Sequence, residues 1–359
     1  MQYQAIIYFL IFVLAILFSV FLTKFLMTFL PKFGFMDRQE KHSTHTMSAV
    51  RGGGISIFLT FFILTFLIVP IDRKILGLFL GCSVVLIVNI IDDMGKFQVT
   101  PFERLFWEIM GILIVISSGI GIDNITNPLG GVIAFDTVRF ELPSFLGKGH
   151  GIMPFSDLFT IIWIILMVNV LNWLDGLDGL ASGVSFICAG TLFFLSLLPF
   201  VNQPNMALMA IILAGAILGF LPFNFLSGKI KLGDSGATIL GFILASLAIL
   251  NKGKIATFFL ILGLPILDAI WVILRRIFID KKSPFVGDKK HFHHRLLKIG
   301  FTKRQVVYII WIYSVIFAVS ALLLQGAEKK LIAIIVMTSL MIIFAATVVF
   351  MSRNKPDIE

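Results

Sequence analysis

The sequence predicts an all-α, polytopic integral membrane protein, and three properties of its composition support that fold class. Hydrophobic residues make up 58% of the 359 residues, and 38 residues are Phe. Charged residues account for 14%, against about 25% in ordinary soluble domains. The mean hydropathy is +1.01. A soluble chain of this length could not bury so much apolar surface, so the soluble, disordered, collagen-like and nucleic-acid-binding classes are excluded.

Apolar runs divide the chain into about 11 transmembrane helices, because each span needs about 20 apolar residues. The predicted spans are 4–30, 54–71, 75–91, 104–122, 155–172, 180–200, 206–226, 235–250, 255–277, 306–325 and 330–351. No repeat of fixed period appears, and 1–359 is treated as a single transmembrane domain. Cys82 and Cys188 both fall inside apolar runs, so we expect neither a disulfide nor a metal-thiolate site.

Successive loops of a polytopic protein lie on alternate sides of the membrane, so the loops form two sets. Most of the Lys and Arg residues belong to one set. That set comprises 31–53, 92–104, 173–179, 227–234, 275–305 and the tail 352–359. Cytoplasmic loops carry the basic excess in membrane proteins. We therefore expect this set to be cytoplasmic, with the N-terminus outside and the C-terminus in the cytoplasm. The net charge of +9 then reports topology rather than a nucleic-acid partner.

The longest external segment, 123–154, contains two short alternating runs. Residues 132–135 and 138–142 flank the polar pair Asp136-Thr137. Alternation around a short polar turn is typical of a β-hairpin, so a small external hairpin is predicted here.

Five carboxylates mark the cytoplasmic ends of predicted spans. Asp92 and Asp93 end the third span, Asp175 and Asp178 follow the fifth, and Asp234 precedes the eighth. The sidedness rests on Lys and Arg alone, so the convergence of these acids on one face is independent of it. A single Asp at a helix end commonly caps the helix, but ionisable groups at this depth are functional candidates by default.

A cluster of like carboxylates needs a counter-charge, because each raises the pKa of the others. One interpretation is structural, with salt bridges to Lys96, Lys229, Lys231 and Arg51. The other is a hard divalent cation. Oxygen ligands suit Mg²⁺, which keeps waters and bridges protein carboxylates and substrate phosphates. We favour the Mg²⁺ interpretation, with Mn²⁺ as a substitute.

The cytoplasmic loop 275–305 carries ten basic residues and two acids. Its segment Lys289-Lys-His-Phe-His-His-Arg295 could rest on anionic lipid headgroups. Zinc held by the three imidazoles is disfavoured by the neighbouring cations and by the lack of a nearby Cys. Imidazoles among Lys and Arg suit a phosphate-rich ligand better.

Arg51-Gly-Gly-Gly54 adds a cation beside backbone N–H groups that we expect to be exposed. An acidic metal cluster and a basic phosphate-binding loop at the same membrane surface favour one chemistry. It is phosphoryl transfer between a soluble nucleotide-activated donor and a lipid acceptor.

Four motifs occur in an order that resembles a known family. They are Asp92-Asp93, Asn172-x-x-Asp175-Gly-Leu-Asp178-Gly-Leu180, Gly233-Asp234-Ser-Gly236 and His291-x-His293-His294-Arg295. Together they resemble the polyprenyl-phosphate N-acetylhexosamine-1-phosphate transferase superfamily, over about residues 38–310. The resemblance implies transfer of a sugar-1-phosphate from a UDP-N-acetylhexosamine to undecaprenyl phosphate, with release of UMP and a requirement for Mg²⁺. It also implies a homodimeric, multi-pass enzyme of the bacterial cytoplasmic (inner) membrane, with its active site on the cytoplasmic face.

The family's residue roles carry over by motif position. The resemblance implies that Asp234 ligates Mg²⁺ and that Asp92 and Asp93 lie at the metal and lipid-phosphate end, all three being catalytic. Asp175 is implied to lie towards the nucleotide. The remaining implied substrate-binding residues are Arg51, Lys96, Asn172, Asp178, His291, His293, His294 and Arg295.

Two branches of the family compete. The string His-Phe-His-His-Arg resembles the branch that uses UDP-GlcNAc to start O-antigen, enterobacterial common antigen or teichoic-acid linkage units. The phospho-MurNAc-pentapeptide transferase branch carries three adjacent His instead. Val50 departs from the family, which usually has Pro there. Phe102 and Glu103 stand where the family often has a Lys-rich stretch, and they leave Arg104 alone.

A secondary transporter is the alternative from a different class. Transporters show internal repeats and broken helices near the bilayer centre, whereas here no repeat is visible and the acids gather at one surface. Asp268 is the exception, a mid-span acid near Pro265, where a kink is expected. It either forms a hydrogen bond at the helix break or contributes to the site from a bent ninth helix.

Overall fold

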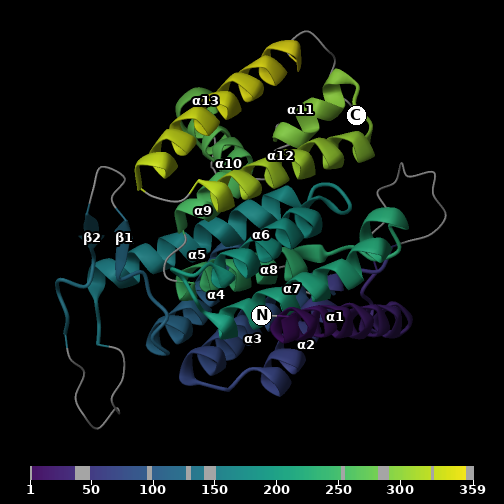
Figure 1. The fold of residues 1–359 in the computed structure, drawn as a ribbon. Helices are drawn as coiled ribbons and strands as arrows, with labels where there is room; N and C mark the ends of the chain where they lie inside the picture. The colour runs from purple at the N-terminus through teal and green to yellow at the C-terminus, as the bar shows by residue number, and fades with distance from the viewer. Residues whose placement is uncertain are drawn as a thin grey trace. The chain divides into compact units, whose positions relative to one another are not determined.

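The computed structural model describes residues 2–36, 49–94, 99–126, 131–140, 151–251, 255–281, 291–324 and 327–352. The chain divides into two units, which are described separately. One comprises 1–125 and 132–254, and the other 126–131 and 255–359. Helices dominate both units (Figure 1).

The first unit is a bundle built around one buried helix. Its helices are α1 (Gln2–Phe29), α2 (Gly53–Ile68), α3 (Arg73–Asp93), α4 (Pro101–Ser117), α5 (Pro154–Leu174), α6 (Leu180–Leu197), α7 (Pro204–Leu221) and α8 (Gly233–Leu250). Every residue from Ser235 to Ile249 in α8 is buried, and α8 packs against α2, α3, α5 and α6 (Figure 1). A short 3₁₀ turn, η1 (Leu30–Phe33), extends α1, and a π-helical turn, η3 (Pro222–Leu226), extends α7. Helix α8 is therefore the central helix of the bundle, and the half-buried Gly233-Asp234 stands at its first turn.

The second unit is also helical in its described residues. Its helices are α9 (Ile255–Ile261), α10 (Gly263–Arg275), α11 (Phe292–Ile299), α12 (Lys303–Leu323) and α13 (Ala327–Ser352), with a π-helical turn, η4 (Arg276–Asp280), after α10. The short helix α11 packs against α12 and α13. This unit carries the His segment.

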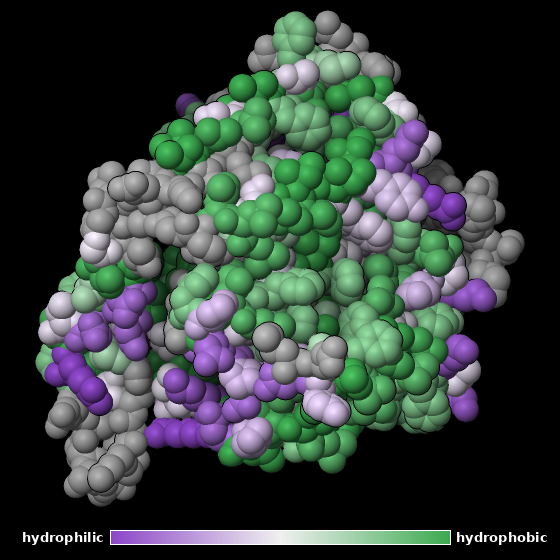
Figure 2. Space-filling view, viewed as in Figure 1, coloured by the Kyte–Doolittle hydropathy of each residue, from purple (hydrophilic) through white to green (hydrophobic). Residues whose placement is uncertain are grey.

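The predicted spans correspond to helices throughout the described chain. Within that part of the chain, seven helices are long and apolar enough to cross a membrane, and α2 and Thr338–Met351 of α13 are shorter apolar helices. Large apolar side chains such as Phe9 and Phe21 of α1 are exposed, and Figure 2 shows apolar residues over broad areas of the visible face. Apolar surface on this scale marks contact with lipid or other apolar surroundings, and it indicates a multi-pass membrane protein. The number of crossings and the sidedness stay predictions.

The span predicted over 255–277 is divided into two helices, α9 and α10. The helix breaks at Leu262, whose backbone (φ −94°, ψ 9°) lies outside the helical range, and α10 begins at Gly263. Pro265 has no N–H to donate to the carbonyl of Ile261, four residues earlier, so the hydrogen-bond ladder is interrupted there. The expected kink near Pro265 is confirmed.

The predicted pairing of the hairpin is wrong in the described residues. Strand β2 (Val132–Ala134) pairs with β1 (Asn124–Thr126), whereas Phe140 forms an isolated bridge with Ile152. Asp136-Thr137 lacks the Gly that tight hairpin turns favour. A small two-stranded sheet exists, but the strand that pairs with β2 is β1, which precedes it in the chain.

Candidate functional site

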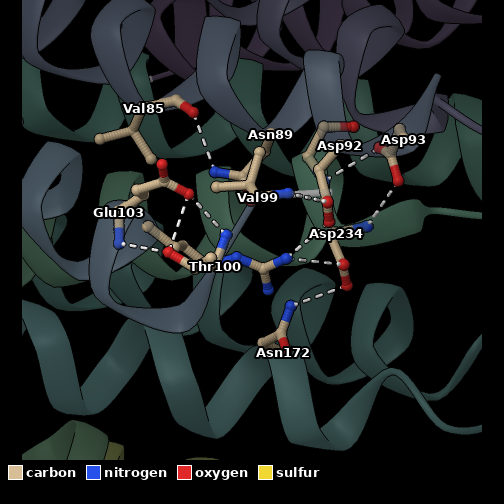
Figure 3. A network of polar contacts seen from close by, with 11 residues as sticks. Val85, Asn89, Asp92, Asp93, Val99, Thr100, Glu103, Asn172 and Asp234 are labelled. Carbon is tan, nitrogen blue, oxygen red and sulfur yellow. Dashed lines mark hydrogen bonds and ion pairs between the residues drawn. The ribbon is translucent and has the colours of Figure 1, made fainter. Parts of the chain in front are cut away.

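Four helix ends of the first unit bring polar side chains together. Helix α3 ends with Asp92 and Asp93, α8 begins with Gly233-Asp234, and Asn172 lies in the last turn of α5 (Figure 3). Helix α4 begins after Thr100, which forms a capping box with Glu103. Capping fixes where α4 begins and so sets the position of Arg104 in its first turn.

Arg104 links two of the predicted catalytic acids. One of its guanidinium nitrogens donates to Asp92 Oδ2 at 2.6 Å and to Asp234 Oδ2 at 3.1 Å. The side chain of Arg104 is 25% exposed, that of Asp92 21% and that of Asp234 38%. These three side chains therefore face partly towards solvent. Arg104 was not among the predicted site residues, although a basic residue at the start of a predicted span is a usable signal.

The other carboxylate oxygens of this pair are also held. Asn172 Nδ2 donates to Asp234 Oδ1 at 3.2 Å, and the Val99 N–H donates to Asp92 Oδ1 at 3.2 Å (Figure 3). The structure therefore brings together Asp92, Asp234 and Asn172, as predicted, from α3, α8 and α5.

Asp93 makes contacts of a different kind. Its side chain is buried, and its two oxygens accept the backbone N–H groups of Asp234 at 3.2 Å and Ser235 at 3.1 Å (Figure 3). These are N–H groups of the first turn of α8, where Leu232, the N-cap residue, provides no side-chain cap. Gly233 has a φ of +76°, and a Cβ there would lie 2.8 Å from Asp93 Oδ2. Asp93 thus holds the start of α8, and its assignment as a metal ligand stays a prediction.

The glycines after Arg51 serve close packing. The N–H groups of Gly53 and Gly54 donate to the carbonyls of Lys231 and Leu232 at 3.0 and 3.2 Å, so the expectation that they are exposed is wrong. A Cβ on Gly54 would lie 2.2 Å from the Cα of Gly236. Only glycine allows α2 and α8 to approach this closely, and the hydrogen bonds satisfy the N–H groups that proximity buries.

The Asp175–Asp178 loop follows α5. Desolvation, followed by the neighbouring carboxylates Asp234 and Asp178, raises the pKa of Asp175 well above its ordinary value. Asp178 is exposed. A cluster of this kind binds cations more readily than anions, because each further negative charge would be repelled.

Asn224 in η3 anchors this loop and was not selected from the sequence. Its Oδ1 accepts the Gly179 N–H at 2.8 Å and the Ser182 hydroxyl at 3.0 Å, and its Nδ2 donates to the Ile230 carbonyl at 3.0 Å. The buried amide therefore connects the loop after Asp178 with the segment that leads to α8. A polar residue inside the predicted span 206–226 was the available signal.

The His segment lies in the second unit, where it begins α11. His291 is the N-cap residue, and its Nδ1 lies 2.9 Å from Asp268 Oδ2. His293 is buried, and its Nε2 has no hydrogen-bond partner among the described residues. Burial, followed by the neighbouring imidazoles His294 and His291, lowers the pKa of His293 to about 3. His293 is therefore neutral at physiological pH.

His294 and Arg295 are half-buried on α11. Lys96, the remaining predicted substrate-binding residue, lies outside the described residues.

A divalent cation fits the first-unit site in one specific way. Among the described residues, no group of three or more His, Cys, Asp or Glu side chains is arranged to hold a metal ion. Mg²⁺ commonly takes only one or two protein carboxylates and completes its shell with waters and substrate phosphates. Asp92 and Asp234 each place an oxygen on the same Arg104 nitrogen, so both carboxylates face one cationic group and are the residues that would hold such a cation.

Comparison with known proteins identifies the family. The profile of glycosyl transferase family 4 matches residues 75–252. A probable undecaprenyl-phosphate N-acetylglucosaminyl 1-phosphate transferase of Bacillus subtilis is 29% identical over 88% of this chain and 84% of its own. The undecaprenyl-phosphate alpha-N-acetylglucosaminyl 1-phosphate transferase of Thermotoga maritima is 27% identical over 95% of this chain and 98% of its own. A phospho-N-acetylmuramoyl-pentapeptide-transferase of Pelotomaculum thermopropionicum is 31% identical over 59% of this chain and 69% of its own.

The fold and the site together define a class of protein: a helical membrane protein with carboxylates gathered at its helix ends. The chain belongs to glycosyl transferase family 4, the superfamily of polyprenyl-phosphate N-acetylhexosamine-1-phosphate transferases. The two N-acetylglucosaminyl 1-phosphate transferases align over nearly its whole length, which confirms the predicted resemblance to that branch.

Proposed function

We propose that this enzyme transfers N-acetylglucosamine-1-phosphate, or a close N-acetylhexosamine-1-phosphate, from a UDP-sugar to undecaprenyl phosphate. An oxygen of the lipid phosphate attacks the β-phosphorus of the donor. The bond from that phosphorus to the bridging oxygen breaks, and UMP leaves. The product is the lipid-pyrophosphoryl sugar that initiates a cell-envelope polysaccharide. The observation that carries the proposal is the convergence of Asp92 and Asp234 beside Arg104, in a chain of this family.

The site's charges suit two phosphates that must approach each other. A phosphate monoester has a second pKa of about 6, so the acceptor is ionised at neutral pH without a strong base. Mg²⁺ held by Asp92 and Asp234 would supply charge neutralisation when bound. Asn172 orients Asp234 through its 3.2 Å hydrogen bond, and Asp93 holds the backbone on which Asp234 stands. Positioning of this kind supplies a large part of the rate enhancement in phosphoryl transfer.

The donor is assigned to the remaining polar groups. Arg51, Lys96 and the His segment are proposed to bind the diphosphate of the UDP-sugar, and Asp175 and Asp178 are proposed to line the cleft towards the nucleotide. Cationic and imidazole donors match a diphosphate. By the distribution of Lys and Arg, we place the site on the cytoplasmic face of the bacterial cytoplasmic membrane. We also expect a homodimer.

A phospho-MurNAc-pentapeptide transferase is the second candidate, favoured by the 31% identity to the Pelotomaculum protein. That similarity covers 59% of this chain, whereas the N-acetylglucosaminyl 1-phosphate transferases cover far more. Membership of a transferase family disfavours the secondary transporter, which would release no UMP.

A donor screen tests the proposal. Purified protein, undecaprenyl phosphate and Mg²⁺ are combined with UDP-GlcNAc, UDP-GalNAc or UDP-MurNAc-pentapeptide, and UMP is measured. We expect UMP with UDP-GlcNAc or a close N-acetylhexosamine, and a loss of orders of magnitude in Asp234→Asn. Asp72→Asn, at the start of α3, is the matched control, because Asn also caps helices. UMP release only with the pentapeptide donor would establish the second candidate, and no release with any donor would refute both.

A further inference from the structure

Glu108 is a buried acid that lies one helical turn after Arg104 on α4. Its side chain is 4% exposed, on the face of the helix that also buries Gly111 and Val115. Residues four apart share a face of a helix, with Cβ atoms about 5–6 Å apart. Burying a carboxyl costs free energy unless hydrogen bonds or a counter-charge compensate. The groups around Glu108 therefore indicate what it does.

The guanidinium of Arg104 is the cation that acts on Glu108. The two side chains interact electrostatically, but within the described part of the chain Glu108 forms neither a hydrogen bond nor an ion pair. The guanidinium is bonded elsewhere, because its nitrogen Nη2 donates to both Asp92 and Asp234. Glu108 is thus a buried carboxyl close to a cation that two other carboxylates hold.

A second polar group without a partner lies on the neighbouring helix. Asn89 of α3 is 1% exposed, and its Nδ2 donates to the Val85 carbonyl at 2.9 Å (Figure 3). That bond fixes which end of the amide is the oxygen, and Oδ1 has no hydrogen-bond partner among the residues described. Buried polar atoms are rarely left unpaired, so each one needs an explanation. The Asn89 oxygen is an acceptor that a further donor could use.

Both groups lie in the seam between α3 and α4. A Cβ on Gly81 would lie 2.6 Å from the Gly111 carbonyl oxygen, and a Cβ on Gly111 would lie 2.7 Å from Cγ2 of Val85. Asn89 follows Val85 by four residues, so it continues this face of α3. Glu108 precedes Gly111 by three residues, so it continues the facing side of α4. The two unpartnered groups therefore line the part of the seam that leads from this contact to the end of α3 and the start of α4.

A divalent cation would compete with Arg104 for Asp92 and Asp234, which we call the acidic pair. The Oδ2 atoms of both carboxylates already accept from Arg104. Positive charges held by the same carboxylates repel each other, so the guanidinium must leave when a cation binds there. The affinity for the cation then depends on the groups that receive the guanidinium, because a buried charge left unpaired is costly.

We propose that Glu108 and Asn89 form a second position for the Arg104 guanidinium, which it takes up when a divalent cation binds the acidic pair. The Glu108 carboxylate balances the charge of the guanidinium, and the Asn89 oxygen accepts one of its N–H groups. Glu108 is thus a positioning residue that acts on the cation site through Arg104. The inference rests on the proposed function and deepens it, because it adds two residues that set the affinity for the cation.

Glu108→Gln and Asn89→Leu each remove one part of the second position. Gln keeps the size of the side chain but cannot balance the guanidinium. We expect Mn²⁺, counted by electron paramagnetic resonance on the full-length protein in detergent, to bind roughly 10-fold more weakly to Glu108→Gln, as the loss of a charge-assisted hydrogen bond implies. Asn89→Leu should weaken binding several-fold, because the acceptor it removes is neutral. Thermal unfolding in the same detergent checks that both variants are folded.

The decisive comparison repeats both changes in the Arg104→Gln background. With no guanidinium to relocate, neither change should then alter the Kd of Mn²⁺ by more than about twofold. Glu103→Gln is the matched control for the general effect of charge. It removes an exposed carboxylate from the same helix, and Gln retains the capping box with Thr100. The control should shift the Kd by less than about twofold, because exposed charges are screened.

Three outcomes would overturn the inference. They are an unchanged Kd of Mn²⁺ in folded Glu108→Gln or Asn89→Leu, the same weakening in the Arg104→Gln background, and an equal weakening by Glu103→Gln. Each of these leaves the proposed function intact if the unchanged protein releases UMP. Failure of the proposed function would be seen separately, as absence of UMP release by the unchanged protein with every donor.

Discussion

Replacing Asp93 should destabilise the protein more than replacing its neighbour Asp92. Asp93 is 3% exposed and accepts two backbone N–H groups of α8. Removal of a capping side chain costs about 1 kcal/mol, and a buried donor left unpaired costs about 1–3 kcal/mol. We therefore expect Asp93→Ala to lower the free energy of unfolding by about 3 kcal/mol. The partly exposed ion pair of Asp92 with Arg104 is worth about 1 kcal/mol or less.

The assay is thermal unfolding of Asp92→Ala, Asp93→Ala and Asp93→Asn in the same detergent. The midpoint should be lowest for Asp93→Ala. Asp93→Asn should be intermediate, because its one side-chain oxygen can accept one of the two N–H groups. The reasoning would be refuted if Asp93→Ala unfolded at the same temperature as the unchanged protein, or if Asp92→Ala were the less stable of the two.

Three further predictions follow from single contacts. Arg104→Gln removes the cation between two carboxylates, so Mn²⁺, counted by electron paramagnetic resonance, should bind several-fold more tightly, by about 1 kcal/mol; unchanged or weaker binding would contradict competition for those oxygens. Gly54→Ala forces a Cβ against backbone at 2.2 Å and should cost about 1–3 kcal/mol in unfolding free energy. A Cβ on Gly190 would meet no atom within 4 Å, so Gly190→Ala should leave the unfolding free energy unchanged. Equal unfolding midpoints for the two variants would argue against the close approach of α2 and α8 at Gly54. Asn224→Leu leaves the Gly179 N–H unpaired and should lower stability by about 2 kcal/mol, whereas a stability equal to that of the unchanged protein would show that the amide does not anchor the loop.

Local pattern accounts for what was predicted correctly. An apolar run long enough to span a bilayer must satisfy its backbone within itself, so it forms a helix whatever surrounds it. The carboxylates were therefore placed at span ends, and their ordered motifs indicated the family. Where two helices, α9 and α10, replace one predicted span, the cause is also local, because Pro265 removes a hydrogen bond.

Contacts between segments that are far apart in the sequence could not be predicted from local sequence patterns. The predicted hairpin failed because β2 found its partner upstream. The glycines after Arg51 were expected to expose N–H groups, but they pair with a segment almost 180 residues away, around Lys231. Neither partner can be read from the residues on either side of the motif.

Sequence alone determined the class of protein, the helices and the neighbourhood of the acids, because length, apolarity and motif order are properties of short segments. Tertiary structure decided what each acid does. Asp92 and Asp93 are adjacent, but successive residues of a helix point about 100° apart, so one meets Arg104 and the other meets the start of α8. Asp268 likewise acquired its partner only when folding brought α11 to α10. A side chain's role depends on the groups within about 3 Å of it, and only the folded chain supplies those groups.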